Sequence, residues 1–171
     1  MRTFTESSPQ GVQRSTGQAI IEFALIAPIM LIMLLGMIDL GRAFVYGVTA
    51  QEGARQAARL AAVANYDSTI DDSAVLGRLI AASDPALNGC ASVTTAQTCG
   101  GGAWTLSTSV TNGGSTYNTI ANARAANALA GATVTLTASG SVALFPGFQA
   151  GAMGMSLPQI SVQGQAVMVV L

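Results

Sequence analysis

The residue with the clearest chemical potential is Glu22, which lies five residues after Gly17 and directly before an almost unbroken apolar run, residues 23–38. A carboxylate at the start of a membrane-length apolar helix is costly to desolvate unless it finds a partner charge. Cleavage of the chain after Gly17 would create such a partner, because it exposes an N-terminal ammonium that Glu22 can meet when subunits stack. The spacing therefore indicates processing followed by assembly.

Other residues with chemical potential do not combine into a known site. The chain has no His, so the commonest general base and metal ligand is missing. Glycines 100–102 lack the following Lys of a phosphate loop. Asp67, Asp71 and Asp72 invite a calcium site but lack the Gly and the closing Glu of an EF-hand loop, which favours a solvated turn. We therefore predict no enzyme, no cofactor and no metal.

The two cysteines, Cys90 and Cys99, stand in a stretch rich in Gly, Ser and Thr. Two unpaired thiols are one interpretation, and a metal site is a weaker one because no further Cys or His completes it. The anchor that precedes them favours a disulfide in an oxidising compartment. Closing so short a loop stabilises a fold by roughly 2–3 kcal/mol.

The composition is unusually poor in charge. Of 171 residues, 50% are hydrophobic and 9% are charged, against about 25% charged in ordinary soluble domains. The net charge of −1 gives no reason to expect nucleic acid. After Asp84 the only charged side chain is that of Arg124. Such a surface suits an exported domain that is packed into a larger assembly.

A long helix is predicted from residue 18 to residue 63, with residues 18–40 crossing the membrane. Arg2 and Arg14 before the apolar run favour a cytoplasmic N-terminus, although arginines also follow it. A secretory signal peptide is the competing interpretation, but its apolar core is usually only 7–15 residues long. Pro28 predicts a kink. Close helix packing is predicted at three glycines: Gly36, Gly41 and Gly47.

The second part of this helix is expected to be amphipathic, with one narrow apolar face. Leu40, Phe44 and Val48 repeat at every fourth position, and the face continues through five alanines: Ala54, Ala57, Ala58, Ala61 and Ala62. Asp39 and Arg42 are spaced as a helical ion pair at the membrane border, where a solvated pair is expected.

The remainder predicts an α+β fold in which a small antiparallel sheet packs on the long helix. A short helix is expected over residues 73–82, with Asp71 or Asp72 as its cap. Residues 117–129 are ambiguous. Three strands are expected over residues 104–110, 133–144 and 160–171, in a sheet of three or four strands.

Residues 17 to about 62, which begin GQAIIEFALIAPIMLIMLLGMIDLGRAF, resemble the N-terminal signature of the TadE-like pseudopilins, minor pilins of the tight-adherence (Tad/Flp, type IVc) pilus system. The resemblance implies a pilin-like fold and cleavage by a prepilin peptidase that leaves Gln18 as the new N-terminus. It also implies that Glu22 and Phe23 have the family's roles at the fifth and sixth positions of the mature chain.

The organisation that follows has three parts: a cytoplasmic leader, residues 1–17; the long helix; and an extracytoplasmic α+β domain, residues 64–171. The resemblance implies a single-pass protein of the bacterial cytoplasmic membrane. Its expected partners are the prepilin peptidase, other pilins, the Tad inner-membrane assembly proteins and membrane lipid. The alternative is an uncleaved, membrane-anchored envelope adhesin.

Overall fold

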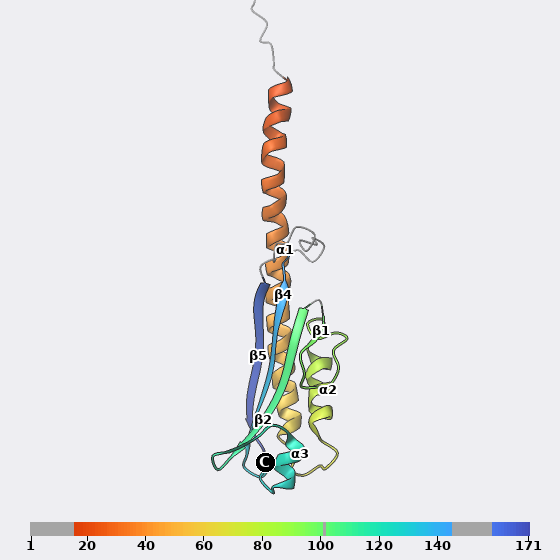
Figure 1. The fold of residues 1–171 in the computed structure, drawn as a ribbon, viewed down its shortest axis with the longest axis vertical. Coiled ribbons are helices and arrows are strands. Elements are labelled where there is room, and N and C mark those ends of the chain that lie inside the picture. The colour runs from red at the N-terminus through yellow and green to blue at the C-terminus, as the bar shows by residue number, and fades with distance from the viewer. Residues whose placement is uncertain (1–15, 101, 145–158) are drawn as a thin grey trace, which may run out of the picture. The chain divides into compact units, whose positions relative to one another are not determined.

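The computed structural model describes residues 16–100, 102–144 and 159–171 (Figure 1). The chain divides into two compact units, Met1–Leu35 and Gly36–Leu171, and the boundary falls within helix α1 (Thr16–Ala61). The predicted leader therefore lies almost wholly outside the described residues. The helix begins close to the predicted start, and it continues on both sides of Pro28.

In the first unit, α1 carries large apolar side chains around its whole circumference, and nearly all of them are exposed. Phe23, for example, is 72% exposed. A helix that is apolar on every side belongs either in a protein core or in a membrane. The segment from Gly17 is long and apolar enough to cross a bilayer.

The second unit contains a five-stranded antiparallel sheet, so the predicted α+β class is confirmed. The strands are β1 (Gln97–Cys99), β2 (Gly102–Asn112), β3 (Ser115–Tyr117), β4 (Thr133–Ala143) and β5 (Gln159–Val169), in the order β1-β2-β4-β5, with β3 paired to β2. The three long strands match the three predicted ones. The sheet is larger than expected because β1 and β3, three residues each, are too short to show an alternating pattern.

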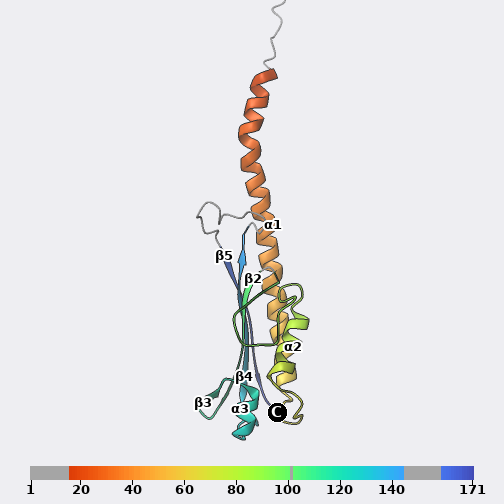
Figure 2. The ribbon, with the colours of Figure 1, turned by 45° about the vertical axis from the view of Figure 1, so that its right-hand side comes forward.

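Two short helices complete this unit, α2 (Asp72–Ala82) and α3 (Ile120–Ala125). The Asp71 carboxylate caps α2 by accepting a hydrogen bond from the Ala74 N–H at 2.9 Å. The ambiguous segment resolves into the last residue of β3, a turn and α3, which Thr119 caps. In Figure 2, α1 and α2 lie on the same side of the sheet.

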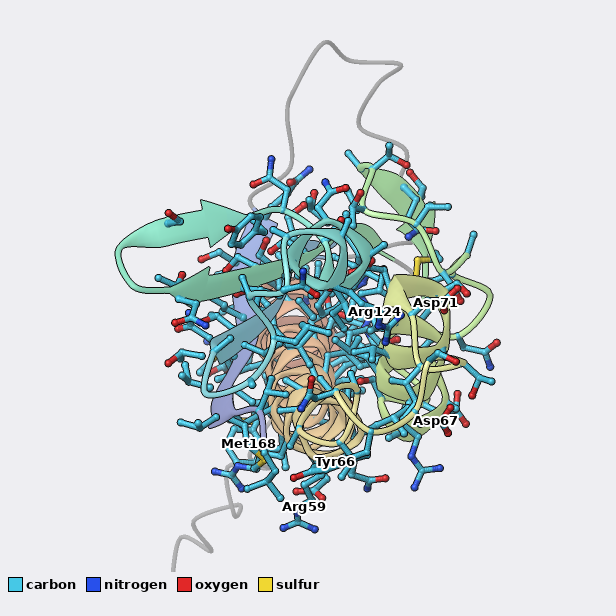
Figure 3. All side chains as sticks on the ribbon, turned by 90° about the horizontal axis from the view of Figure 1, so that it is seen from below. Arg59, Tyr66, Asp67, Asp71, Arg124 and Met168 are labelled. Carbon is cyan, nitrogen blue, oxygen red and sulfur yellow. A yellow bond between two sulfur atoms is a disulfide. The ribbon has the colours of Figure 1, made fainter. Side chains whose placement is uncertain are left out.

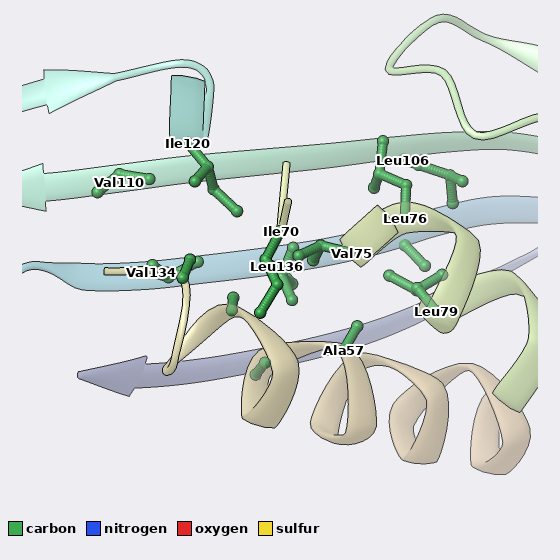
Figure 4. Packing of buried hydrophobic residues seen from close by; sticks show 14 of the residues in the cluster. Ala57, Ile70, Val75, Leu76, Leu79, Leu106, Val110, Ile120, Val134 and Leu136 are labelled. Atoms are coloured by element: carbon green, nitrogen blue, oxygen red, sulfur yellow. The ribbon is translucent and has the colours of Figure 1, made fainter. Parts of the chain in front are cut away.

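The core forms where the inward side chains of the sheet meet α1 and α2 (Figure 4). Along β2 and β4, buried and more exposed residues alternate through most of each strand, which is the pattern of a sheet covered on one face. The other face of these strands carries mostly hydroxyl groups, from Thr105, Ser107, Ser109, Thr111, Thr133, Thr135, Thr137, Ser139 and Ser141. These hydroxyls can hydrogen-bond to water, so the surface is hydrated although it carries no charge.

The backbone of α1 comes very close to β5. A Cβ atom built on Gly164 would stand 2.4 Å from the carbonyl carbon of Ala50. Beside it, the Gln51 amide donates to the Gln165 carbonyl at 2.6 Å and accepts from the Gln165 N–H at 3.0 Å. This side chain thus occupies backbone groups on the free edge of β5, which would otherwise be open to another strand.

The predicted apolar face of α1 is half correct. The alanines are buried as expected, together with Ala43 and Ala50. Leu40, Phe44 and Val48, which were expected on the same face, are exposed instead. The narrow gap against the sheet admits only small side chains, so these larger residues lie on another side of the helix.

Arg124 joins three elements at the end of this unit (Figure 3). From α3, its guanidinium donates to the carbonyls of Ala64 and Ile70 at 2.9 and 2.7 Å, in the turn between α1 and α2. In return, the Asp72 carboxylate of α2 accepts from the backbone N–H of Ile120 at 2.9 Å. The last charged side chain of the sequence therefore has a structural role.

Gly53 provides a test of the close packing between α1 and α2. A Cβ atom at this position would stand 2.7 Å from the Leu79 carbonyl oxygen and would overlap the Ser83 hydroxyl. We expect Gly53→Ala to lower the free energy of unfolding by about 1–3 kcal/mol, because backbone must shift. Gly41→Ala is the matched control, since no atom lies within 4 Å of its Cβ position. Thermal unfolding of the full chain in detergent measures both, and equal stability of the two variants would contradict the packing.

Candidate functional site

The residues predicted to matter for processing and assembly lie in the first two turns of α1. The helix begins at Thr16, so Gly17 and Gln18 belong to its first turn, and Glu22 and Phe23 follow in the second. All four are exposed. Gln18 and Glu22 are four positions apart, which puts them on one face of the helix. The structure thus brings the proposed new N-terminus and the acidic residue together on one side.

The exposed apolar surface of residues 20–35 is the largest functional signal in this region. Twelve large apolar side chains in this range are between 44% and 73% exposed. Isolated exposed apolar residues are common on soluble proteins, but a continuous patch of this kind indicates contact with a membrane or with other proteins. Composition and length permit either a bilayer span or a helix–helix interface.

The three glycines predicted to allow close packing are in two different situations. Gly36 and Gly41 have no atom within 4 Å of their Cβ positions, so a neighbour could approach the helix backbone there. Gly47 already faces β5, with the Val162 side chain 3.5 Å from its Cβ position. The close approaches of α1 to its neighbours at Gly53 and Gly164 were not predicted from the sequence. For Gly164 the sequence does carry a signal, because a glycine inside a strand often marks the close approach of another backbone.

Asp39 and Arg42 do form the predicted ion pair, with 3.7 Å between the guanidinium and the carboxylate. The pair is not solvated as expected, because Asp39 is buried. Arg42 also donates to the Ala143 carbonyl at 2.9 Å, at the end of β4. The residues at the border of the apolar segment therefore help to fix the sheet to α1.

The structure pairs Cys90 with Cys99 in a disulfide, as predicted. The loop is held further by the Gln97 amide, which accepts from the Ala91 N–H at 2.7 Å and donates to the Ala91 carbonyl at 3.0 Å. Gly100 directly follows the loop and has a φ of +56°. A Cβ atom at this position would overlap the Ala86 carbonyl oxygen. The bridge links a loop after α2 to β1 of the sheet.

The three aspartates considered for calcium serve the backbone instead. Asp67 accepts from the Thr69 hydroxyl and N–H, and these bonds lower the pKa of its carboxyl. The cap of α2, with the Ala74 N–H first and the Ser73 hydroxyl second, lowers the pKa of Asp71 in the same way. Within the described ranges, no group of three or more His, Cys, Asp or Glu could hold a metal ion.

Comparison with known proteins links the first part of α1 and most of its second part to a family. A family model described as TadE-like protein matches residues 17–59, which confirms the resemblance over that segment. The match ends within α1 and leaves the sheet, α2 and α3 outside it. No curated protein matches the chain. No solved structure matches it either.

The cap at Asp71 makes the stability of this unit depend on pH. Its folded pKa lies below the unfolded value of about 3.9. The charged cap therefore stabilises the fold above that value, and this contribution is lost as the pH falls through the folded pKa. Asp71→Asn is the comparison, because Asn also caps helices but does not titrate there.

We expect wild type to exceed Asp71→Asn in thermal midpoint at pH 7 and to lose this advantage below about pH 4. Asp67 titrates in both proteins and cancels in the difference. The midpoints of both chains in detergent, followed by circular dichroism between pH 7 and pH 2, measure the effect. A difference that is independent of pH would contradict the assigned role of the carboxylate.

Proposed function

We propose that this chain is a minor pilin or pseudopilin of a bacterial Tad-type pilus assembly or secretion system. The observation that carries the proposal is the TadE-like match over residues 17–59, on a helix whose first part exposes apolar side chains on every side. In this interpretation residues 1–17 are a cytoplasmic leader, residues 18–40 cross the inner membrane, and residues 64–171 lie outside the cytoplasm.

The placement of the domain is supported by its chemistry. Disulfides persist in oxidising compartments and are rare in the cytoplasm, so the Cys90–Cys99 bridge favours an extracytoplasmic location. The mostly uncharged hydroxyl face of the sheet agrees with a domain that works by packing. The role is structural rather than catalytic, and the proposed partners are other pilins and the inner-membrane assembly proteins.

The proposed mechanism begins with cleavage by a prepilin peptidase between Gly17 and Gln18. The cleavage exposes an ammonium group on Gln18. Glu22 lies one helical turn further on, so its carboxylate can pair with the ammonium of its own chain or of an adjacent one. In an apolar environment an unpaired carboxylate is costly, so pairing with the ammonium of an adjacent chain favours stacked helices.

Processing can be tested at the scissile bond. We expect Gly17→Val to block cleavage, because a branched side chain replaces the hydrogen of glycine beside that bond. Gly36→Val is the matched control in the same helix, and its Cβ position is also open. The mass of the purified chain, expressed with and without an active prepilin peptidase, reports cleavage.

The wild-type chain should lose residues 1–17 only when the peptidase is present. An intact Met1 in the presence of active peptidase would refute the pseudopilin proposal and favour the uncleaved adhesin. Processing of Gly17→Val at the wild-type rate would refute the assigned cleavage site alone.

The carboxylate of Glu22 can be tested separately from cleavage. We expect Glu22→Ala to be processed but to enter the assembled fraction at least about tenfold less, because breaking a desolvated ion pair costs roughly 3–5 kcal/mol. Glu52→Ala is the control, since Glu52 is an exposed residue of the same helix beyond the apolar segment. Immunoblots of sheared filaments and of membranes measure the ratio, and normal assembly of Glu22→Ala would remove the proposed role.

A further inference from the structure

An open groove runs along the free edge of β5, and all of its lining residues belong to the second unit. β5 is the last strand of its sheet, with no described strand beyond it (Figure 1). One wall of the groove is β5, residues 160–163, and the other is α1, with the exposed side chains of Leu40, Phe44 and Val48. We propose, independently of cleavage and of the membrane anchor, that this groove binds an uncharged, extended segment of another protein, which adds to β5 as a further strand.

The backbone of β5 offers hydrogen bonds to such a segment. The N–H and the carbonyl of Gln165 point away from β4, toward the Gln51 amide to which both are bonded. These directions alternate along a strand, so Ser161 and Gln163 direct their N–H and carbonyl groups to the same free edge, beside the groove. Main-chain groups at a sheet edge are a template for an added strand.

The Gln51 side chain sets one end of this template. Because its amide already satisfies Gln165, a strand in the groove pairs with Ser161 and Gln163 and ends there. An apolar helix in the same place would leave these two residues without main-chain partners, because a helix bonds its own N–H and carbonyl groups internally. The edge therefore favours an extended segment over a helix.

The α1 wall supplies apolar contacts for alternate side chains of the segment. Leu40, Phe44 and Val48 are 62%, 72% and 54% exposed, and their spacing of four positions aligns them along the helix. The Val162 side chain, 3.5 Å from the Cβ position of Gly47, shows which face of β5 is turned toward α1. Every second side chain of an added strand extends this face. The wall thus selects apolar residues at alternate positions.

The charge of the groove matches an uncharged segment. Among the lining residues only Glu52 and Arg55 are charged, and both follow Gln51, beyond the template. They also form an ion pair with each other, at 3.9 Å. A charged side chain placed between Phe44 and Ile160 would lose water and gain no partner charge. An uncharged strand avoids this cost.

A tethered strand can test the groove in the full chain. We would fuse the uncharged, alternating sequence of residues 133–139, TVTLTAS, behind Leu171. A linker of ~16 Gly and Ser residues has a root-mean-square length of ~22 Å. This is comparable to the ~26 Å of strand between Gln163 and Leu171. The fused strand then has an effective concentration on the order of 1 mM. The matched control carries Leu136→Pro in the fused copy alone, because proline disrupts a strand.

Amide hydrogen exchange, followed for each residue by NMR in detergent, reports the added hydrogen bonds. We expect the fused strand to slow the exchange of Ser161 and Gln163 at least about tenfold relative to the proline control. Val167 and Val169 direct their N–H groups to the same edge but lie outside the groove, so their exchange should not change. Equal exchange in the two fusions, or slower exchange at the two valines instead, would overturn the proposal.

The apolar wall is tested by substitution within the fused chain. Phe44→Asp should abolish the slow exchange, whereas Tyr66→Asp should retain it, since Tyr66 is 77% exposed and lies outside the groove. Slow exchange that survives Phe44→Asp would overturn the assigned groove. Slow exchange in the unfused chain that increases with protein concentration would identify a second copy as the occupant, which also overturns the proposal.

Discussion

The packing of the second unit depends on how closely the backbone of α1 approaches β5. At Gly164 there is no room for even one additional carbon atom beside Ala50. This distance explains why the buried face of α1 consists, apart from Asp39, of alanine and glycine and why larger apolar residues lie outside it. It also brings Gln51 within hydrogen-bonding distance of Gln165, so that the helix which covers the sheet also protects part of its open edge.

The two parts of α1 satisfy opposite requirements within one helix. Its first part exposes bulky residues such as Phe23 and Leu25, which are suited to an apolar environment such as the interior of a bilayer. Its second part buries small residues such as Ala57 and Ala58 against a sheet. Between them, Asp39 and Arg42 pair and hold the end of β4, so the change in environment coincides with a polar contact to the sheet.

The sequence predicted those features that depend on local pattern. The apolar run, a cap at Asp71 or Asp72 and the three long strands each have a periodic or capping signal. The two cysteines are close in the sequence, and the chain has no third cysteine to pair with either of them. The buried Asp39, the clamp by Arg124 and the exposure of Phe44 had no such signal, because each depends on which segments meet in space. A four-residue repeat shows that Leu40, Phe44 and Val48 share a face, but not which face the sheet covers.

Several charged side chains of the second unit are held by backbone groups of the same fold. The Arg124 guanidinium donates hydrogen bonds to backbone carbonyls, and the Asp71 and Asp72 carboxylates accept hydrogen bonds from N–H groups at helix N-termini. The outer face of the sheet offers hydroxyls, which exchange water for a neighbour's hydrogen bonds at much lower cost than ions do. This arrangement would lower the cost of the packing proposed above, because these three ionic groups are already compensated within the fold.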